Sequence, residues 1–551
     1  SAKGIGHERA LPAPPRSPAF LEAARLAFGM SASAGCACWR HARRHASLYT
    51  SLVLAASAGA IAGLALPWRQ ACTIFVTVLL LCLWLAGEPD MAAVSLLPVA
   101  LFPALGVVGS RAVAEQYFSD TALLLLGSYL LSIALQEVQG HTRMALGLLC
   151  SLPGDPRAVL AGFMAVSALL SMFMSNTAAA SVMCPLAASI SRELRAAQGG
   201  RPCGGDEDDE ESAARPSDAC LERYLRRVML GIAYSCSIGG CATITGTGTN
   251  VAFSQVYSRL EASAIPWCSW VLVGLPITVA MLLICWCQLV FVSGLGLPRG
   301  YRIQMSQLRE RYNELSGTTR AQATVYVALI ATMLGWMFRA PRVIPGWADL
   351  LPDPHMVSDS TLVMAIGVTL FFLPAQQKGS ADHSTEGGGI LTWSRVQAQL
   401  PLGLLLLIGA GSTISLAFKE SGLSDSLSSV LSSLQGCPNF VLVLITCCAA
   451  AGMSQMVSDV ATALVLLPIA HSFAISLNEN PLIMMIPVTF SCSLPFTLPI
   501  STPPNAIAFQ TGSLRQAEMV RIGLPLVFVG LGVILAVCFS FGLRALGVQP
   551  V

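Results

Sequence analysis

Three adjacent side chains with hydrogen-bonding groups lie in the middle of an apolar segment of membrane length. Ser175, Asn176 and Thr177 interrupt the stretch that runs from Gly162 to Ile190. Hydroxyl and amide oxygens accept hydrogen bonds or coordinate small cations, and the asparagine amide also donates. Polar groups are costly inside a bilayer and commonly mark a pathway for an ion or a substrate. The triplet therefore indicates a binding site within the membrane.

A second triplet, Ser458-Asp459-Val460, lies far downstream in a similar apolar segment. The first triplet precedes "AAASVMCPLA" and the second precedes "ATALVLLPIA". Other matches flank the triplets in the same order: segments 120–137 and 399–418 come before them, and "AYSCSIGGCATITGTGTNVAF" (233–253) and "TFSCSLPFTLPISTPPNAIAF" (489–509) come after them. Since an odd number of predicted spans separates equivalent points, we expect two copies that insert with opposite orientation.

The last pair of matches contains residues that break helices. Glycines in "ITGTGTN" and prolines in "ISTPPN" predict unwound loops at residues 244–250 and 500–505. Unwound backbone occurs at membrane depth only where it lines a cavity or a ligand. Helix N-termini there attract an anion, while carbonyl and hydroxyl oxygens suit a small cation. Inverted repeats with broken helices are typical of secondary transporters with a site at the bilayer midplane.

The composition agrees with a protein that lies mostly in a membrane. The chain has 551 residues, of which 54% are hydrophobic and 11% are charged, whereas a soluble domain carries about 25% charged residues. The net charge of +2 implies no nucleic-acid partner. The 18 cysteines are scattered through apolar segments, so we interpret most of them as buried thiols. No Ser/His/Asp set, metal cluster or nucleotide loop is evident, so the chain is not expected to be an enzyme.

Long apolar segments of about 20 residues predict transmembrane helices. The sequence thus predicts an all-α polytopic membrane protein with about 11 such helices in two inverted repeats. Segments 120–137 and 399–418 appear too short or too glycine-rich to cross, and we interpret both as re-entrant hairpins. The expected spans are 49–66, 71–88, 91–108, 158–190, 228–257, 268–294, 321–338, 357–374, 438–472, 480–512 and 521–545.

Arginine-rich loops set the expected topology. Residues 192–227 and 298–320 each carry several arginines, and positive loops stay in the cytoplasm. We expect a cytoplasmic, partly disordered tail over 1–47 and a first half over 48–295. A cytoplasmic linker over 296–320 and a second half over 321–551 follow.

The ordered matches resemble a known family of membrane transporters. Ser175-Asn176-Thr177, "TITGTGTN", "STPPNAIAF" and "VSDSTLVMAIGVTLFFLPAQ" are together similar to the divalent anion–sodium symporters, solute carrier family 13. That group includes sodium-coupled dicarboxylate, citrate and sulfate transporters, and the resemblance covers residues 45 to 545. It implies a plasma-membrane homodimer, surrounded by membrane lipid, whose transport domain moves against a scaffold domain in an elevator-like manner.

The resemblance also implies roles for individual residues. Sodium, the coupling ion, is expected in two or more copies, at Ser171, Ser175, Asn176, Gly246, Gly248, Ser458, Asp459 and Ser501. The anionic substrate is expected to contact Asn176, Thr177, Thr247, Asp459, Val460, Thr502 and Asn505.

Asp459 departs from the family pattern, which has Asn at this position of the second triplet. At about 5 Å and an effective dielectric constant of ~20, its charge repels one charge of a divalent anion by roughly 3 kcal/mol. Asp459 is therefore expected to bind a cation, to be protonated or to face water. Three interpretations stay open: sodium–dicarboxylate symport with altered affinity, coupling to a proton or a less charged substrate, and impaired transport.

We therefore expect sodium-coupled symport of di- or tricarboxylates such as succinate or citrate by alternating access. A sulfate transporter is the alternative within the same family, because both classes of substrate are divalent and rich in oxygen. An anion channel needs a continuous pore, which no segment predicts. A receptor that binds the anion without transporting it is the remaining alternative.

Overall fold

The computed structural model describes most of the chain. Its described residues are 32–86, 90–199, 218–261, 265–295, 303, 306–315, 317–339, 345–374, 389–431, 438–511 and 514–546. Residues 1–31, where a disordered tail was predicted, lie outside these ranges, and α2 begins at Ala32 within the predicted tail. All the described elements are helices, with no β-strand among them, which confirms the predicted all-α class.

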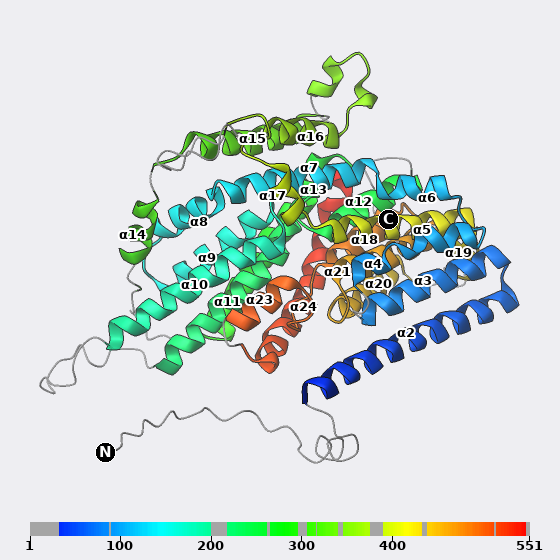
Figure 1. Ribbon diagram of the computed structural model, residues 1–551, viewed down its shortest axis with the longest axis horizontal. Helices are drawn as coiled ribbons and strands as arrows, with labels where there is room; N and C mark the ends of the chain where they lie inside the picture. Colours follow the sequence, from blue (N-terminus) through cyan, green and yellow to red (C-terminus); the bar gives the residue numbers. More distant parts are fainter. Residues whose placement is uncertain are drawn as a thin grey trace, which may run out of the picture.

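The first half of the chain builds a run of helices that ends in a π-helical turn (Figure 1). In chain order they are α2 (Ala32–Ala65), α3 (Trp68–Ala86), α4 (Met91–Val94), α5 (Leu97–Ala104), α6 (Ser110–Tyr117), α7 (Asp120–Glu137), α8 (Gly140–Cys150), α9 (Pro156–Ser171), α10 (Asn176–Gly199), α11 (Asp218–Gly240), α12 (Gly248–Glu261), α13 (Trp267–Cys287) and the π-helix η2 (Gln288–Val292).

The second half follows the same plan and also ends in a π-helical turn, here followed by a short helix. Its helices are α14 (Ser306–Glu314), α15 (Arg320–Met337), η3 (Trp347–Leu350), η4 (Pro354–Met356), α16 (Asp359–Thr369), α17 (Trp393–Gln399), α18 (Leu402–Glu420), α19 (Leu423–Leu431), α20 (Asn439–Ser454), α21 (Asp459–Ser476), α22 (Leu482–Cys492), α23 (Pro503–Thr511), α24 (Gln516–Val537), η6 (Cys538–Gly542) and α25 (Leu543–Ala545).

Six helical segments among the described residues are long and apolar enough to cross a bilayer. Two of them, Ser110–Glu137 and Leu402–Glu420, contain all or most of the segments 120–137 and 399–418 that we interpreted as hairpins. That interpretation is wrong, because α7 and α18 are each one continuous helix. Their glycines lie inside the helices, where Gly127 packs closely against Val363. The other four segments are Leu48–Ala65, Trp267–Val292, Asp459–Ser476 and Gln516–Gly542.

The chain turns at the two polar triplets instead. Predicted span 158–190 is divided into α9 and α10 by a break just before Asn176, and span 438–472 is divided into α20 and α21 just before Asp459. The helices α9, α10 and α11 lie side by side (Figure 1). The length of these two predicted spans already indicated a break, because a helix of more than 30 residues would exceed the roughly 30 Å hydrocarbon core by half.

The last long helices of the two repeats run in opposite directions. Gln288, just after α13, donates from Nε2 to the Ile522 carbonyl near the start of α24 (2.7 Å). At the other end, Val273 in the first part of α13 lies against Gly542 beyond the end of α24. This antiparallel pairing is the orientation expected of an inverted repeat.

On each of these helices, a glycine leaves room for the unwound loop of the same repeat to pack closely. A methyl group on Gly274 of α13 would lie 2.5 Å from the Cys241 carbonyl oxygen, and one on Gly523 of α24 would lie 2.1 Å from that of Phe496. Both glycines begin the same tripeptide, Gly-Leu-Pro, which sequence analysis did not use. The repeat therefore extends to the helices that hold the loops in place.

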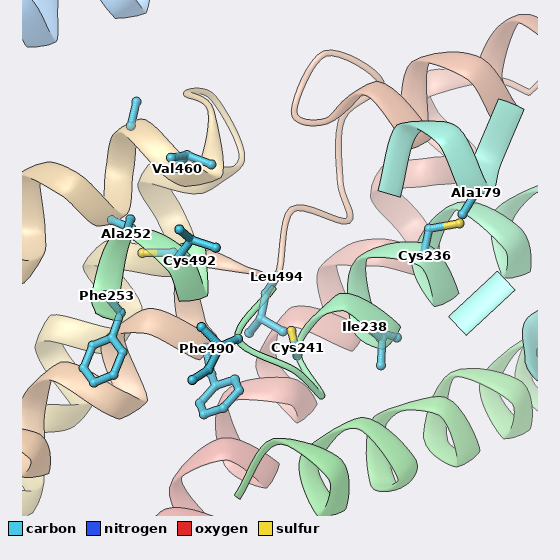
Figure 2. Close-up of a cluster of buried hydrophobic side chains, with 14 of the residues drawn as sticks. Ala179, Cys236, Ile238, Cys241, Ala252, Phe253, Val460, Phe490, Cys492 and Leu494 are labelled. Atoms are coloured by element: carbon cyan, nitrogen blue, oxygen red, sulfur yellow. The ribbon is translucent and has the colours of Figure 1, made fainter. Parts of the chain in front are cut away.

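An apolar core surrounds the unwound loops and joins the two repeats. Figure 2 shows Cys241 and Leu494, one on each loop, beside each other. The Trp270 ring stacks on Phe490 of the other repeat with centroids 5.0 Å apart, and its Nε1 donates to the Cys241 carbonyl (3.1 Å). The fourteen cysteines from Cys72 onward whose side chains are described are free thiols, and most of them are buried as predicted.

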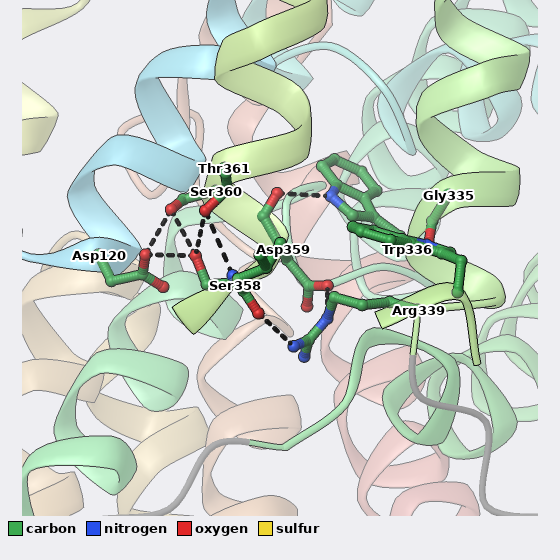
Figure 3. A network of polar contacts seen from close by, with 10 residues as sticks. Asp120, Gly335, Trp336, Arg339, Ser358, Asp359, Ser360 and Thr361 are labelled. Atoms are coloured by element: carbon green, nitrogen blue, oxygen red, sulfur yellow. Dashed lines mark hydrogen bonds and ion pairs between the residues drawn. The ribbon is translucent and has the colours of Figure 1, made fainter. Parts of the chain in front are cut away.

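A polar network fixes α7 to α15 and α16 at one edge of the molecule (Figure 3). Arg339, just after α15, pairs with Asp359 at the start of α16 (2.5 Å). Asp120, at the start of α7, accepts hydrogen bonds from the hydroxyls of Ser358 (2.6 Å) and Ser360. These contacts anchor α7, whose Ser128, Tyr129 and Ser132 reach the candidate site described below.

Candidate functional site

A cavity of about 210 Å³ lies where the two triplets and the two unwound loops meet. All three residues of each triplet line it, together with Thr245 to Gly248 from the first loop and Thr502 to Pro504 from the second. One wall comes from α7 and from Leu404 of α18. Segments more than 300 residues apart, such as Asn176 and Pro504, thus contribute to one site.

The first triplet and the first loop form a cluster of oxygen atoms. The Ser171 hydroxyl lies 2.5 Å from Asn176 Oδ1 and 2.7 Å from the Cys236 carbonyl oxygen. A hydroxyl has a single proton to donate, so it cannot satisfy both acceptors at once. Several oxygen atoms thus lie close together, and oxygen ligands are what a small hard cation requires.

Gly240, the last residue of α11, lets this cluster close. A methyl group on Gly240 would lie 2.8 Å from Asn176 Oδ1 and 2.9 Å from the Gly246 carbonyl oxygen, so these two oxygens approach the same point. Thr243 ties the loop to the turn before the triplet by donating to the Met172 carbonyl (2.9 Å). Sequence analysis missed Gly240 because helical glycines usually serve close packing.

The second triplet places a carboxylate in the cavity. Asp459 is half-buried and begins α21, and its Oδ1 accepts a hydrogen bond from the Val460 backbone N–H (2.8 Å). The Ser458 hydroxyl is farther away, at 3.5 Å. Among the described residues no basic side chain forms an ion pair with Asp459, so its charge must be balanced by a cation, a proton or water.

In the second half, the side chain of Gln455, three residues before Ser458, forms hydrogen bonds that the corresponding residue of the first half cannot form. Its Nε2 donates to the carbonyls of Ala451 (2.7 Å) and Leu494 (2.8 Å). Its Oε1 accepts from both the backbone N–H and the hydroxyl of Thr497 (3.1 and 2.9 Å). The corresponding residue of the first half is Met172. Alignment of the two triplets in the sequence places Gln455 opposite Met172, which was the available signal for this difference.

Two asparagines hold the unwound loops in the same way. Asn250 Nδ2 donates to the carbonyls of Gly240 (3.2 Å) and Thr243 (2.8 Å), ten and seven residues earlier. Asn505 Nδ2 donates to the carbonyls of Pro495 (2.7 Å) and Leu498 (3.2 Å), also ten and seven residues earlier. Both asparagines are buried. The shared "Asn-x-Ala-Phe"-like ending of the repeats was the available signal for this role.

The structure places most of the predicted site residues at the cavity and three of them behind it. Asn505 does not line the cavity, and its amide holds the loop instead. Ser171 lies behind Asn176, and the Ser501 hydroxyl donates to the Gln455 carbonyl (2.6 Å). The predicted residues that line the cavity are Ser175, Asn176, Thr177, Gly246, Thr247, Gly248, Ser458, Asp459, Val460 and Thr502.

The two repeats touch directly beside the cavity. A methyl group on Gly248 would lie 2.6 Å from the Val460 side chain, so the first loop packs on the second triplet. The hydroxyls of Thr249 and Ser493 are 2.6 Å apart, which links the two loops. The two half-sites are therefore in direct contact.

Four helices begin at the cavity. Asn176, Gly248, Asp459 and Pro503 are the first residues of α10, α12, α21 and α23, and all four line the cavity. The N-terminus of a helix carries a partial positive charge and backbone N–H donors, so it favours an anion. The cavity thus offers oxygen clusters for a cation and helix ends for an anion.

Comparison with known proteins gives a consistent answer. The family model described as "Sodium:sulfate symporter transmembrane region" matches residues 46–547. The human Na(+)/dicarboxylate cotransporter 3 is 32% identical, with 85% of this chain and 87% of the relative aligned. The sodium-dependent low-affinity dicarboxylate transporter 1 of Caenorhabditis elegans is 31% identical over 80% and 81%. The mouse Na(+)/citrate cotransporter is 30% identical over 85% and 89%.

Two solved structures share the fold. The YdaH transporter of Alcanivorax borkumensis aligns with a TM-score of 0.53, over 87% of this chain and all of that one. MtrF of Neisseria gonorrhoeae aligns with a TM-score of 0.54, over 87% of this chain and 95% of that one. Both are 14% identical to this chain, so the likeness concerns the fold alone.

Proposed function

We propose that this chain, which belongs to the sodium:sulfate symporter family, is a secondary active transporter that couples the entry of sodium to that of a di- or tricarboxylate. The family consists of membrane transporters rather than enzymes. The relatives named above are, by their names, sodium-coupled transporters of dicarboxylates or citrate. The observation that carries the proposal is the convergence of four helix N-termini and two sets of oxygen donors on one cavity.

In this proposal the first half supplies the sodium site that is best formed. Ser171, Asn176 and the Gly246 carbonyl would hold the ion, and Ser175 and the Gly248 region would complete its surroundings. Carbonyl, hydroxyl and amide oxygens without a net charge suit a monovalent cation that has to be released again. The bound cation and the helix N-termini together offset the charge of a carboxylate beside Thr177 and Thr247.

Asp459 favours a second candidate, in which a proton replaces one sodium ion. A carboxylate that contacts a divalent anion needs a neutralising partner, and either sodium or a proton can serve. Three remaining features of the proposal derive from the family resemblance: the homodimer, the elevator-like movement and a plasma-membrane location. The cytoplasmic N-terminus is inferred from the arginine-rich loops.

Uptake into proteoliposomes tests the proposal. Purified protein is reconstituted, and labelled succinate, citrate and sulfate are offered while sodium, lithium and proton gradients are imposed one at a time. We expect an inward sodium gradient to accumulate succinate or citrate above its equilibrium level. Accumulation of sulfate alone would contradict the carboxylate assignment, a requirement for a proton gradient would contradict sodium as the sole coupling ion, and mere equilibration would indicate a channel.

A further inference from the structure

A second and larger hollow lies far from the candidate site, between α13 with η2, the first part of α24 and α11. It measures about 900 Å³ and is lined by four arginines, Arg226, Arg227, Arg515 and Arg521, with a single acidic residue, Glu518. We call it the arginine groove. The excess of positive charge in its lining is three, since four arginines face one carboxylate.

Ion pairs and a hydrogen bond hold two of the arginines in place at the polar end of the groove. Glu518 pairs with Arg226 (3.2 Å) and with Arg227, which holds both guanidinium groups at the head of the groove. Arg227 Nε also reaches the Gly294 carbonyl (3.4 Å). Glu222, one turn before Arg226 on α11, also pairs with Arg226 (3.7 Å), so two carboxylates balance these two arginines. Arg515 and Arg521 are exposed and form no ion pair among the described residues, so they carry the uncompensated positive charge of the groove.

The wall of the groove is apolar and faces outward. Leu283, Phe291, Val292 and Val529 line it, and all four are exposed large hydrophobic residues. Val292 is 81% exposed, which would be unfavourable in water but is normal for a surface that contacts acyl chains. The groove thus joins a cationic head to an apolar side along the membrane-spanning helices.

The position of the groove fits the cytoplasmic membrane surface. α11 follows the arginine-rich loop 192–227, and η2 precedes the loop 298–320, and positive loops are retained in the cytoplasm. The cytoplasmic leaflet carries the anionic phospholipids, and basic pockets between helices on that side bind their headgroups. At the opposite end of α24, the described residue with positive charge is Arg544.

We propose that the arginine groove binds one anionic phospholipid, with its phosphate at the arginines and its acyl chains along α13, η2 and α24. The two exposed arginines select a negatively charged headgroup, and the apolar wall contacts the acyl chains. Because the groove touches α13 and α24, whose Gly274 and Gly523 pack against the two unwound loops, the lipid also stabilises the helices that position the candidate site.

Native mass spectrometry of purified full-length protein tests this, with phosphatidylserine and phosphatidylcholine titrated in parallel. We expect a preference for phosphatidylserine that the double variant R515Q/R521Q loses, with affinity weaker by on the order of 30-fold. The control is R544Q, which removes one positive charge beyond the other end of α24 and should bind like the unmodified protein. Water-soluble glycerophosphoserine, which lacks acyl chains, should not compete.

Several results would overturn the proposal. Equal binding of phosphatidylserine by R515Q/R521Q and the unmodified protein would do so, as would an equal loss in R544Q. Competition by glycerophosphoserine would show a site for a free phosphodiester instead of a lipid. Cross-linking of two copies through F291C would show that a second chain fills the groove. If the double variant does not fold, a photoreactive phosphatidylserine on the unmodified protein replaces it, and labelling away from Phe291 and Val292 rejects the groove.

Discussion

The two half-sites share a backbone and differ in their side chains. In both repeats a helix ends just before a triplet, an unwound loop packs on a glycine of the last long helix, and an asparagine holds that loop. The first half presents Asn176 and neutral oxygens around Gly240, whereas the second presents Asp459 with the amide of Gln455 behind it. The backbone of the two half-sites is therefore similar, whereas the charge and the packing of their side chains differ.

This contrast indicates that the two half-sites have different roles. In the first half, oxygens from a hydroxyl, an amide and a backbone carbonyl converge on a point where only a glycine fits. In the second half, Gln455 already donates to two backbone carbonyls, so these oxygens are engaged by the protein itself. We expect the first half to dominate cation binding and the second half to determine how the substrate charge is balanced.

The largest effect is expected from G240A. The new methyl group would lie 2.8 Å from Asn176 Oδ1 and 2.9 Å from the Gly246 carbonyl oxygen, so the loop has to shift. Misplacement of this size costs roughly 100-fold in activity, which initial rates of sodium-driven uptake would measure. The matched control is G452A, because a methyl group on exposed Gly452 meets no atom within 4 Å. Normal uptake by G240A would show that the oxygen cluster of the first half does not bind the coupling ion.

An intermediate effect is expected from D459N, which makes the second triplet resemble the first. Removal of a charge about 5 Å from a dianion relieves roughly 3 kcal/mol at an effective dielectric constant of ~20, less whatever a bound cation already offsets. We expect the KM for succinate to fall about tenfold and the dependence of uptake on sodium and pH to change. D425N, which removes an exposed carboxylate on α19, is the control. If sodium, pH and substrate dependence all stay unaltered, Asp459 has no role in coupling.

The smallest effect is expected from Q455M, which gives the second half the residue type found at Met172. The variant loses four hydrogen bonds to Ala451, Leu494 and Thr497, and it leaves some of their partners unpaired. A loss of about 2 kcal/mol in stability should lower the thermal unfolding midpoint in detergent, while uptake falls only a few-fold. M172L is the control in the first half. An unchanged midpoint would mean that the amide is not a structural part of the second half-site.

Much of the site could be predicted because short sequence motifs, each within one segment, identify the repeat. Polar triplets in apolar segments, glycine and proline in the loops, and the order of the matches were enough to indicate the cavity residues from Ser175 to Thr502. The loop-holding role of the Asn505 amide was not predicted, since a side chain that holds its own loop and one that contacts a substrate have the same residue type. The hairpins were misplaced because an apolar helix with internal glycines resembles a broken one in sequence.

By itself, the sequence determined the membrane environment, the family and the residue types at the two half-sites, because burial in lipid leaves few ways to use a polar side chain. Tertiary structure decided which oxygens meet. Gly240, Gly274 and Gly523 are ordinary helical glycines in sequence, and only the packing of distant helices against them brings loop backbone within contact distance. The arginine groove has the same origin, because its four arginines come from two helices nearly 300 residues apart that only the antiparallel arrangement of the repeats places together.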